Sequence, residues 1–225
     1  MVAINPNVSR SAIAGDLHVL ASFMIAGLLS GLLFAWLITR PGLQNFWFIK
    51  GGKLLIPRYT YWVTFSLVLL LGLSGAYIIS RIRHWSLEHS APSPARLFTA
   101  GVLILLSAPV LYSITPAMTT RIGENWVVVA PLAFLLLISV TMCLLSTSLG
   151  LFAFAFIWNL AFCAVGFVSV YAVVRLIPGA NERYEFVQWP ILESMLALSY
   201  GSWLIWGRRL FANQPPNKRL QLTAR

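Results

Sequence analysis

Glu193 is the one carboxylate within a long apolar stretch of this sequence, which makes it the first candidate for chemistry. A charge at the centre of a membrane costs at least about 2.5–3.5 kcal/mol, so an ionisable residue kept there predicts a functional role. The expected role is a proton or cation site. A structural interpretation stays open, because Pro190 is typical of a first helical turn. Glu193 would then lie near the lipid headgroups, paired with Arg175 or Arg183.

Asn159 is the deepest polar side chain, near the centre of another apolar stretch. A lone asparagine at this depth usually forms hydrogen bonds to a neighbouring helix. Ser139 and Thr141 have a similar depth in the preceding stretch, and they are the predicted partners. Contact with a transported substrate is the alternative interpretation.

The three histidines form a third candidate site, because a topology with six crossings places them all on one side of the membrane. Two carboxylates belong to that side as well. Imidazole and carboxylate groups suit zinc or a similar divalent ion, and an imidazole could alternatively ligate haem. The candidate ligands are His18, His84, His89, Asp16 and Glu88. Histidines near headgroups are ordinary, however, and the simpler expectation is that no cofactor binds.

No motif of high specificity points to an enzyme. We find no Ser–His–Asp order, Gly-x-Ser-x-Gly, Walker sequence or carboxylate pair with catalytic spacing. The net charge of +10 would favour nucleic acid as the partner of a soluble protein. Here the basic residues lie at the ends of apolar stretches, where lipid phosphates account for them. We therefore expect neither catalysis nor nucleic-acid binding.

Six apolar stretches must position these residues, and they predict an integral membrane protein. Each has about 20 residues or more, enough to cross a hydrocarbon core of roughly 30 Å. Charged residues make up only 10% of the 225 residues, against about 25% in soluble domains. We expect an all-α fold, with one bundle of six transmembrane helices over residues 1–210 and a polar, disordered tail over residues 211–225. The stretches are residues 17–39, 60–80, 97–117, 126–146, 149–174 and 188–207.

Small residues mark the faces on which the first two stretches are predicted to pack. Gly27 and Gly31 form a GxxxG pattern, and Gly72 and Ala76 repeat the spacing in the second stretch. Such faces let two helices approach closely, so their expected role is helix packing.

Other segments carry local predictions. Residues 1–16 are polar and are expected to have little lasting structure. The aromatic segment 43–49 is too short to span, and we expect it to lie in the interface. Pro109 and Pro116 predict a kink or an early end of the third helix.

The second and fifth stretches end alike. Residues 72–81 and residues 166–175 both read Gly-x4-Tyr-x3-Arg. This favours an inverted repeat of three plus three helices, the plan of many transporters, with chance as the alternative. An even number of crossings places both termini on one side of the membrane. The Lys and Arg counts, 9 on that side and 7 on the other, slightly favour cytoplasmic termini.

The function that these residues favour is a small transporter or permease-like protein, or a membrane partner subunit, in a multi-pass arrangement in the cell membrane. The partners would be the bilayer and another membrane protein or a second copy. In a transporter, Glu193 would couple an ion, and Asn159 would orient substrate or bridge helices. The alternative is a membrane-embedded enzyme or redox subunit that binds a metal or haem and acts through the histidines at one membrane surface. The last ten residues, 216–225, resemble tails of unrelated bacterial reading frames and favour a bacterial inner membrane.

Overall fold

Helices make up most of the described structure, as the sequence predicts. The computed structural model describes residues 6–51, 54–83, 94–121, 135–143 and 152–212. Residues 135–143 form a helical segment. The long helices are α1 (Pro6–Ile38), α3 (Tyr59–Arg83), α4 (Pro94–Arg121), α6 (Phe152–Leu176) and α7 (Tyr184–Ala212), and a short 3-10 helix, η4 (Ala180–Arg183), precedes α7.

Within the described residues, three helical segments are long and apolar enough to cross a membrane: Ala14–Ile38, Tyr59–Ser80 and Phe152–Leu176. They coincide with the first, second and fifth predicted stretches. A shorter apolar helical segment, Pro94–Val110, lies in α4. These segments support a membrane location, whereas a bundle of six spanning helices is not confirmed. Most of the fourth predicted stretch lies outside the described residues.

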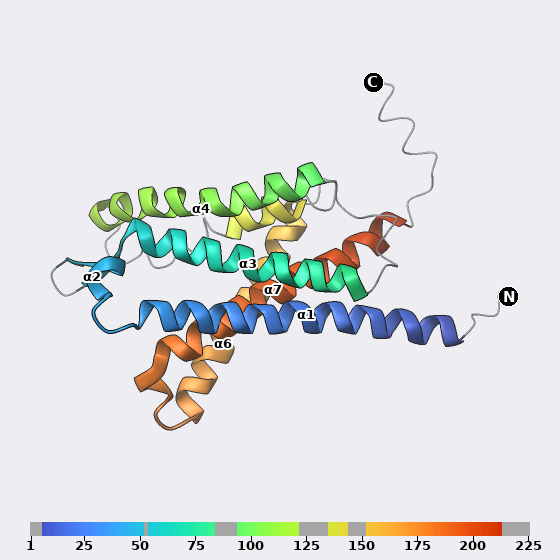
Figure 1. Ribbon diagram of the computed structural model, residues 1–225, viewed down its shortest axis with the longest axis horizontal. Helices are drawn as coiled ribbons and strands as arrows, with labels where there is room; N and C mark the ends of the chain where they lie inside the picture. Colours follow the sequence, from blue (N-terminus) through green and yellow to red (C-terminus); the bar gives the residue numbers. More distant parts are fainter. Residues whose placement is uncertain (1–5, 52–53, 84–93, 122–134, 144–151, 213–225) are drawn as a thin grey trace, which may run out of the picture.

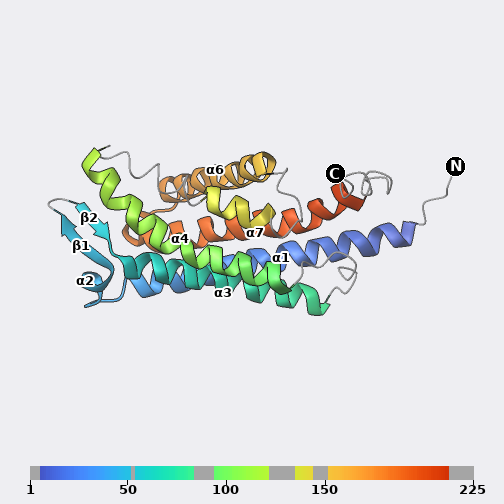
Figure 2. The same cartoon turned by 90° about the horizontal axis from the view of Figure 1, so that it is seen from above.

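Helix α7 lies at the centre of the arrangement. It packs along α1 on one side and against α6 on the other. Helix α3 packs against both α1 and α4. In Figure 1, α1 and α3 run alongside each other, and α7 crosses them obliquely. Figure 2 shows α7 between α6 and the α1–α3 pair. This central position explains why α7 is more polar than the other long helices: much of its surface meets protein rather than lipid.

Two helices extend further than predicted. α1 begins at Pro6, so the expectation of little structure over residues 1–16 is wrong from that proline onward. Proline suits a first helical turn, where its missing N–H is not needed. α4 continues past Pro109 and Pro116 to Arg121, so the early end is also wrong. A proline removes only one hydrogen bond, and spanning helices tolerate it when neighbouring groups satisfy the freed carbonyl.

A short β-hairpin follows α1, a local exception within the helical fold. Trp47 is buried at the base of the hairpin, and its carbonyl accepts a hydrogen bond of 2.8 Å from the Arg58 amide. Aromatic and β-branched residues favour strands, and the glycine pair at residues 51–52 favours a turn. The elements are α2 (Gln44–Trp47), β1 (Phe48–Gly51) and β2 (Leu54–Pro57), and the two strands pair antiparallel.

Candidate functional site

Glu193 lies well inside α7, not in its first turn. The helix begins at Tyr184, about two and a half turns earlier, and Pro190 is within it. The part of the structural interpretation that puts Pro190 at the helix start is therefore wrong, while the depth of Glu193 in a membrane stays a prediction. Its error has a physical reason: residues 184–189 continue the helix on the N-terminal side of the proline, where a missing amide costs only one hydrogen bond.

The Glu193 carboxyl group is buried without a hydrogen-bond partner. Its side chain is 1% exposed, and neither carboxyl oxygen is hydrogen-bonded within the described residues. Ser30 of α1 lies close enough to interact with the carboxyl group, but its hydroxyl donates to the Gly27 carbonyl at 3.1 Å. An isolated carboxylate in an apolar interior is very costly, so this group must hold a proton or meet a cation.

The arginines that the structural interpretation offered as partners are occupied or exposed elsewhere. The Arg175 guanidinium lies over the Tyr171 ring, 5.3 Å from its centroid, and Arg183 is exposed beside η4. Neither forms an ion pair with Glu193, whose carboxyl oxygens have no partner in the described part of the chain.

The glycines of the GxxxG pattern bring α7 onto α1 at this point. A methyl group at Gly27 would lie 2.5 Å from the Glu193 carbonyl oxygen, and one at Gly31 would lie 2.5 Å from the Pro190 Cα. On α3, a methyl group at Gly72 would lie 3.0 Å from the Ser30 Cβ. Gly27 and Gly31 therefore lie against the α7 backbone around Glu193, while Gly72 packs α3 against α1.

An aromatic cluster borders the carboxyl group on the side of the hairpin. It consists of Phe34, Tyr61, Phe65 and Trp189, from α1, α3 and α7. The Phe34 ring centroid lies 5.0 Å from Trp189, 5.2 Å from Tyr61 and 5.3 Å from Phe65. Trp189 is one turn before Glu193. Glu185 is one turn before Trp189 on the same helix, so α7 carries an acidic residue on each side of this tryptophan in the sequence.

Glu185 is the second acidic group of this region, in the first turn of α7. Its Oε2 accepts a hydrogen bond of 2.7 Å from the Trp189 indole N–H. Burial raises the pKa of Glu185, and the hydrogen bond from Trp189 partly offsets this shift. Sequence analysis missed Glu185 because the residue precedes the apolar stretch 188–207.

Asn159 joins three helical segments. Its Nδ2 donates to the Ser139 hydroxyl and to the Met142 sulfur, both at 3.0 Å, and its Oδ1 accepts from Ser199 at 2.7 Å. The predicted bond to Ser139 is confirmed, while Thr141 instead pairs with the Tyr200 hydroxyl. Because these bonds use both amide hydrogens and the carbonyl oxygen, the geometry favours helix bridging over substrate contact.

The predicted metal site lies mostly outside the described residues. His84, Glu88 and His89 belong to the part that is not described, while His18 and Asp16 are in α1. Among the described residues, no group of three or more potential ligands comes together. Metal or haem binding by the histidines therefore stays a prediction.

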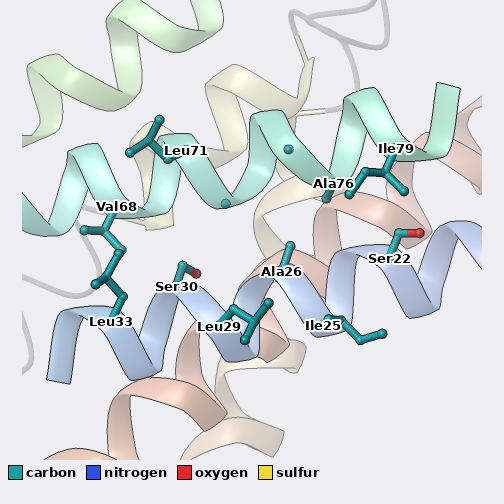
Figure 3. A pocket seen from close by; sticks show the side chains of 12 residues that line it. Ser22, Ile25, Ala26, Leu29, Ser30, Leu33, Val68, Leu71, Ala76 and Ile79 are labelled. Atoms are coloured by element: carbon teal, nitrogen blue, oxygen red, sulfur yellow. The ribbon is translucent and has the colours of Figure 1, made fainter. Parts of the chain in front are cut away.

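A groove of about 720 Å³ runs between α1 and α3 on the outer surface (Figure 3). Its floor contains Ser30, Gly72 and Ala76, and larger apolar side chains form its walls. Sequence analysis missed it, although small residues at every fourth position, Ser22, Ala26 and Ser30, were a usable signal. The lining residues are Ser22, Ile25, Ala26, Leu29, Ser30, Leu33, Val68, Leu71, Gly72, Gly75, Ala76 and Ile79.

No family model, curated protein or solved structure matches this chain. The geometry around Glu193 is thus the basis for assigning a function.

Proposed function

We propose that the protein is a small multi-pass transporter of the cell membrane in which Glu193 binds the coupling proton or cation. The observation that carries the proposal is the buried carboxyl group, whose two oxygens have no hydrogen-bond partner among the described residues. A purely structural glutamate at such a site would gain from a cationic or hydrogen-bonding partner, because the unpaired charge is costly. A group that must alternate between proton and cation instead benefits from having no permanent partner.

The surrounding contacts support movement at this point. α7 meets α1 through Gly27 and Gly31, so the two backbones lie close together at this point. Pro190 weakens the α7 hydrogen-bond ladder one turn before Glu193. Helices interrupted beside a midplane site are a common device of secondary transporters. A small tilt of α7 would change whether a proton or a cation can reach the Glu193 carboxyl group.

Six crossings belong to the proposal, in the order α1, α3, α4, the segment 135–143, α6 and α7. The start of α1 and the end of α7 lie at the same end of the molecule in both views, as an even number of crossings requires (Figures 1 and 2). We place this end in the cytoplasm of a bacterial cell. The inverted repeat gains no support, because Gly72 contacts α1 whereas Gly166 contacts α7, which is not the equivalent neighbour.

Charge movement on a solid-supported membrane tests the function. Purified protein in liposomes is exposed to a panel of inorganic ions, organic cations, organic anions and neutral solutes at an inward proton gradient. We expect at least one class to produce a transient current that Glu193→Gln abolishes. Glu182→Gln is the matched control, because Glu182 is exposed beside η4 and should leave the current unchanged. A current of undiminished size in Glu193→Gln contradicts the proposal.

A further inference from the structure

Ser30 links the outer groove to the buried carboxyl group. It lies on the floor of the α1–α3 groove, and its hydroxyl donates to the carbonyl of Gly27, the residue of α1 that lies against the Glu193 main chain of α7. The groove lies between two segments apolar enough to span a membrane, Ala14–Ile38 and Tyr59–Ser80. Ser30 thus stands between a groove on the outer surface and the part of α7 that carries the buried carboxyl group.

The chemistry of the two ends of this path differs. Exposed Ile25, Leu29, Leu71 and Ile79 line the outer part, and they suit an apolar body rather than a hydrated ion (Figure 3). The inner end offers the Glu193 carboxyl group, which no hydrogen bond from the described part of the chain satisfies. The aromatic cluster stands beside it, and aromatic rings attract a desolvated cation.

We propose, resting on the transport function above, that the substrate is an amphipathic organic cation that enters from the bilayer through the α1–α3 groove and displaces the Glu193 proton. The exchange balances: the carboxylic acid releases one proton to water, and the resulting carboxylate pairs with one monovalent cation. The buried site stays neutral in both states, which avoids the cost of an unpaired charge.

The path is closed in the described structure. The position of a Cβ on Gly72 is 3.0 Å from both the Cβ and the Oγ of Ser30, so α3 holds this serine against α1. Opening requires α1 and α3 to separate near Ser30. No bulky side chain of Gly72, Gly75 or Ala76 obstructs that separation.

Binding of tetraphenylphosphonium to the purified protein in nanodiscs tests the inference, with empty nanodiscs as the blank for partition into lipid. Gly75→Leu adds bulk to the groove lining at a position where a Cβ meets no atom within 4 Å. Ser74→Leu is its matched control, since Ser74 is exposed on the same helix but is not part of the groove lining. Glu193→Gln removes the charge at nearly constant size. Elution volume and thermal unfolding confirm that each variant folds.

We expect wild type and Ser74→Leu to bind alike, Glu193→Gln to bind at least about a hundredfold more weakly, and Gly75→Leu roughly tenfold more weakly. Binding should also release a proton, measured with a pH dye in weak buffer. If wild type does not bind tetraphenylphosphonium, the proposed class of substrate is wrong. The proposed transport function is not contradicted by that result, because the charge-movement panel tests other solutes. Unchanged binding in Gly75→Leu overturns the route through the groove. Unchanged binding in Glu193→Gln overturns the site itself.

Discussion

The closest approach of α1 to α7 places Gly27 against the main chain of Glu193. A methyl group at position 27 would lie 2.5 Å from the Glu193 carbonyl oxygen, well inside van der Waals contact. The residue that carries the candidate chemistry is thus held against α1 through its main chain.

Gly27→Ala should therefore destabilise the protein. The added methyl group must push two helix backbones apart, and overpacking of this kind typically costs about 1–3 kcal/mol. Gly75→Ala is the matched control: its methyl group meets nothing within 4 Å, and alanine favours the helix by up to about 1 kcal/mol. Thermal unfolding in detergent should show a lower Tm for the first variant and an equal or higher Tm for the second. Equal Tm values for the two variants would show that the α1–α7 contact is looser than described.

The Asn159 bridge should behave as a coupled unit. Asn159→Ala leaves the Ser199 and Ser139 hydroxyls without this partner, so we expect the free energy of unfolding to fall by about 1–3 kcal/mol. A double-mutant cycle with Ser199→Ala isolates the bond of 2.7 Å. Bonds between membrane helices have coupling energies of about 0.6 kcal/mol, with values up to about 1.7. If the losses of unfolding free energy in the two single variants simply add in the double variant, the bridge is refuted. Transport by Asn159→Ala should fall only in proportion to the amount of folded protein.

Glu185 should make stability depend on pH. Because burial raises its pKa in the folded protein above the ordinary value of 4.5, the folded state holds the proton more tightly than the unfolded state. Its contribution to stability is therefore full below pH 4.5 and is lost as the pH rises through the raised pKa. Thermal unfolding of wild type and Glu185→Gln over this range should show the extra pH dependence only in wild type. Trp189 fluorescence offers a second signal, since its indole bonds to Glu185. A variant with the same pH slope as wild type would contradict the assignment.

The proposed six crossings make a labelling prediction. After replacement of Cys143 and Cys163, single cysteines at Pro41 and Glu182 should react with an impermeant maleimide from the same side of the membrane, because four crossings separate them. A cysteine at Ala14 should react from the opposite side. All three positions are exposed. Labelling of positions 41 and 182 from opposite sides would rule out this topology.

Hydrophobic length and small-residue spacing were enough to predict several helices and their contacts. Gly27 and Gly31 indicated a packing face, and the depth of Asn159 indicated Ser139 as its partner. Both predictions depend only on the spacing of residues along a helix, and this spacing can be read directly from a sequence. The spacing does not identify the partner helix, however. The sequence alone did not show that the GxxxG face packs against α7.

The misplacement of Glu193 shows where such reasoning fails. Pro190 marks a first turn only if the residues before it are not helical, and no local signal excluded a helix over residues 184–189. Whether Glu193 finds a partner depends on contacts between distant segments. The hairpin after α1 was missed for a similar reason, because aromatic residues suit both an interface and a strand.

The polarity of α7 bears on how the chain is made. Glu193, Ser194, Ser199 and Ser202 are all buried in the finished protein, so they are costly to expose to lipid during synthesis. α7 is also the last helix of the described chain to leave the ribosome. In the proposed six-span topology, α7 would therefore enter the bilayer against a surface of α1 and α6 that is already in place, and assembly of the bundle would be coupled to insertion of this helix.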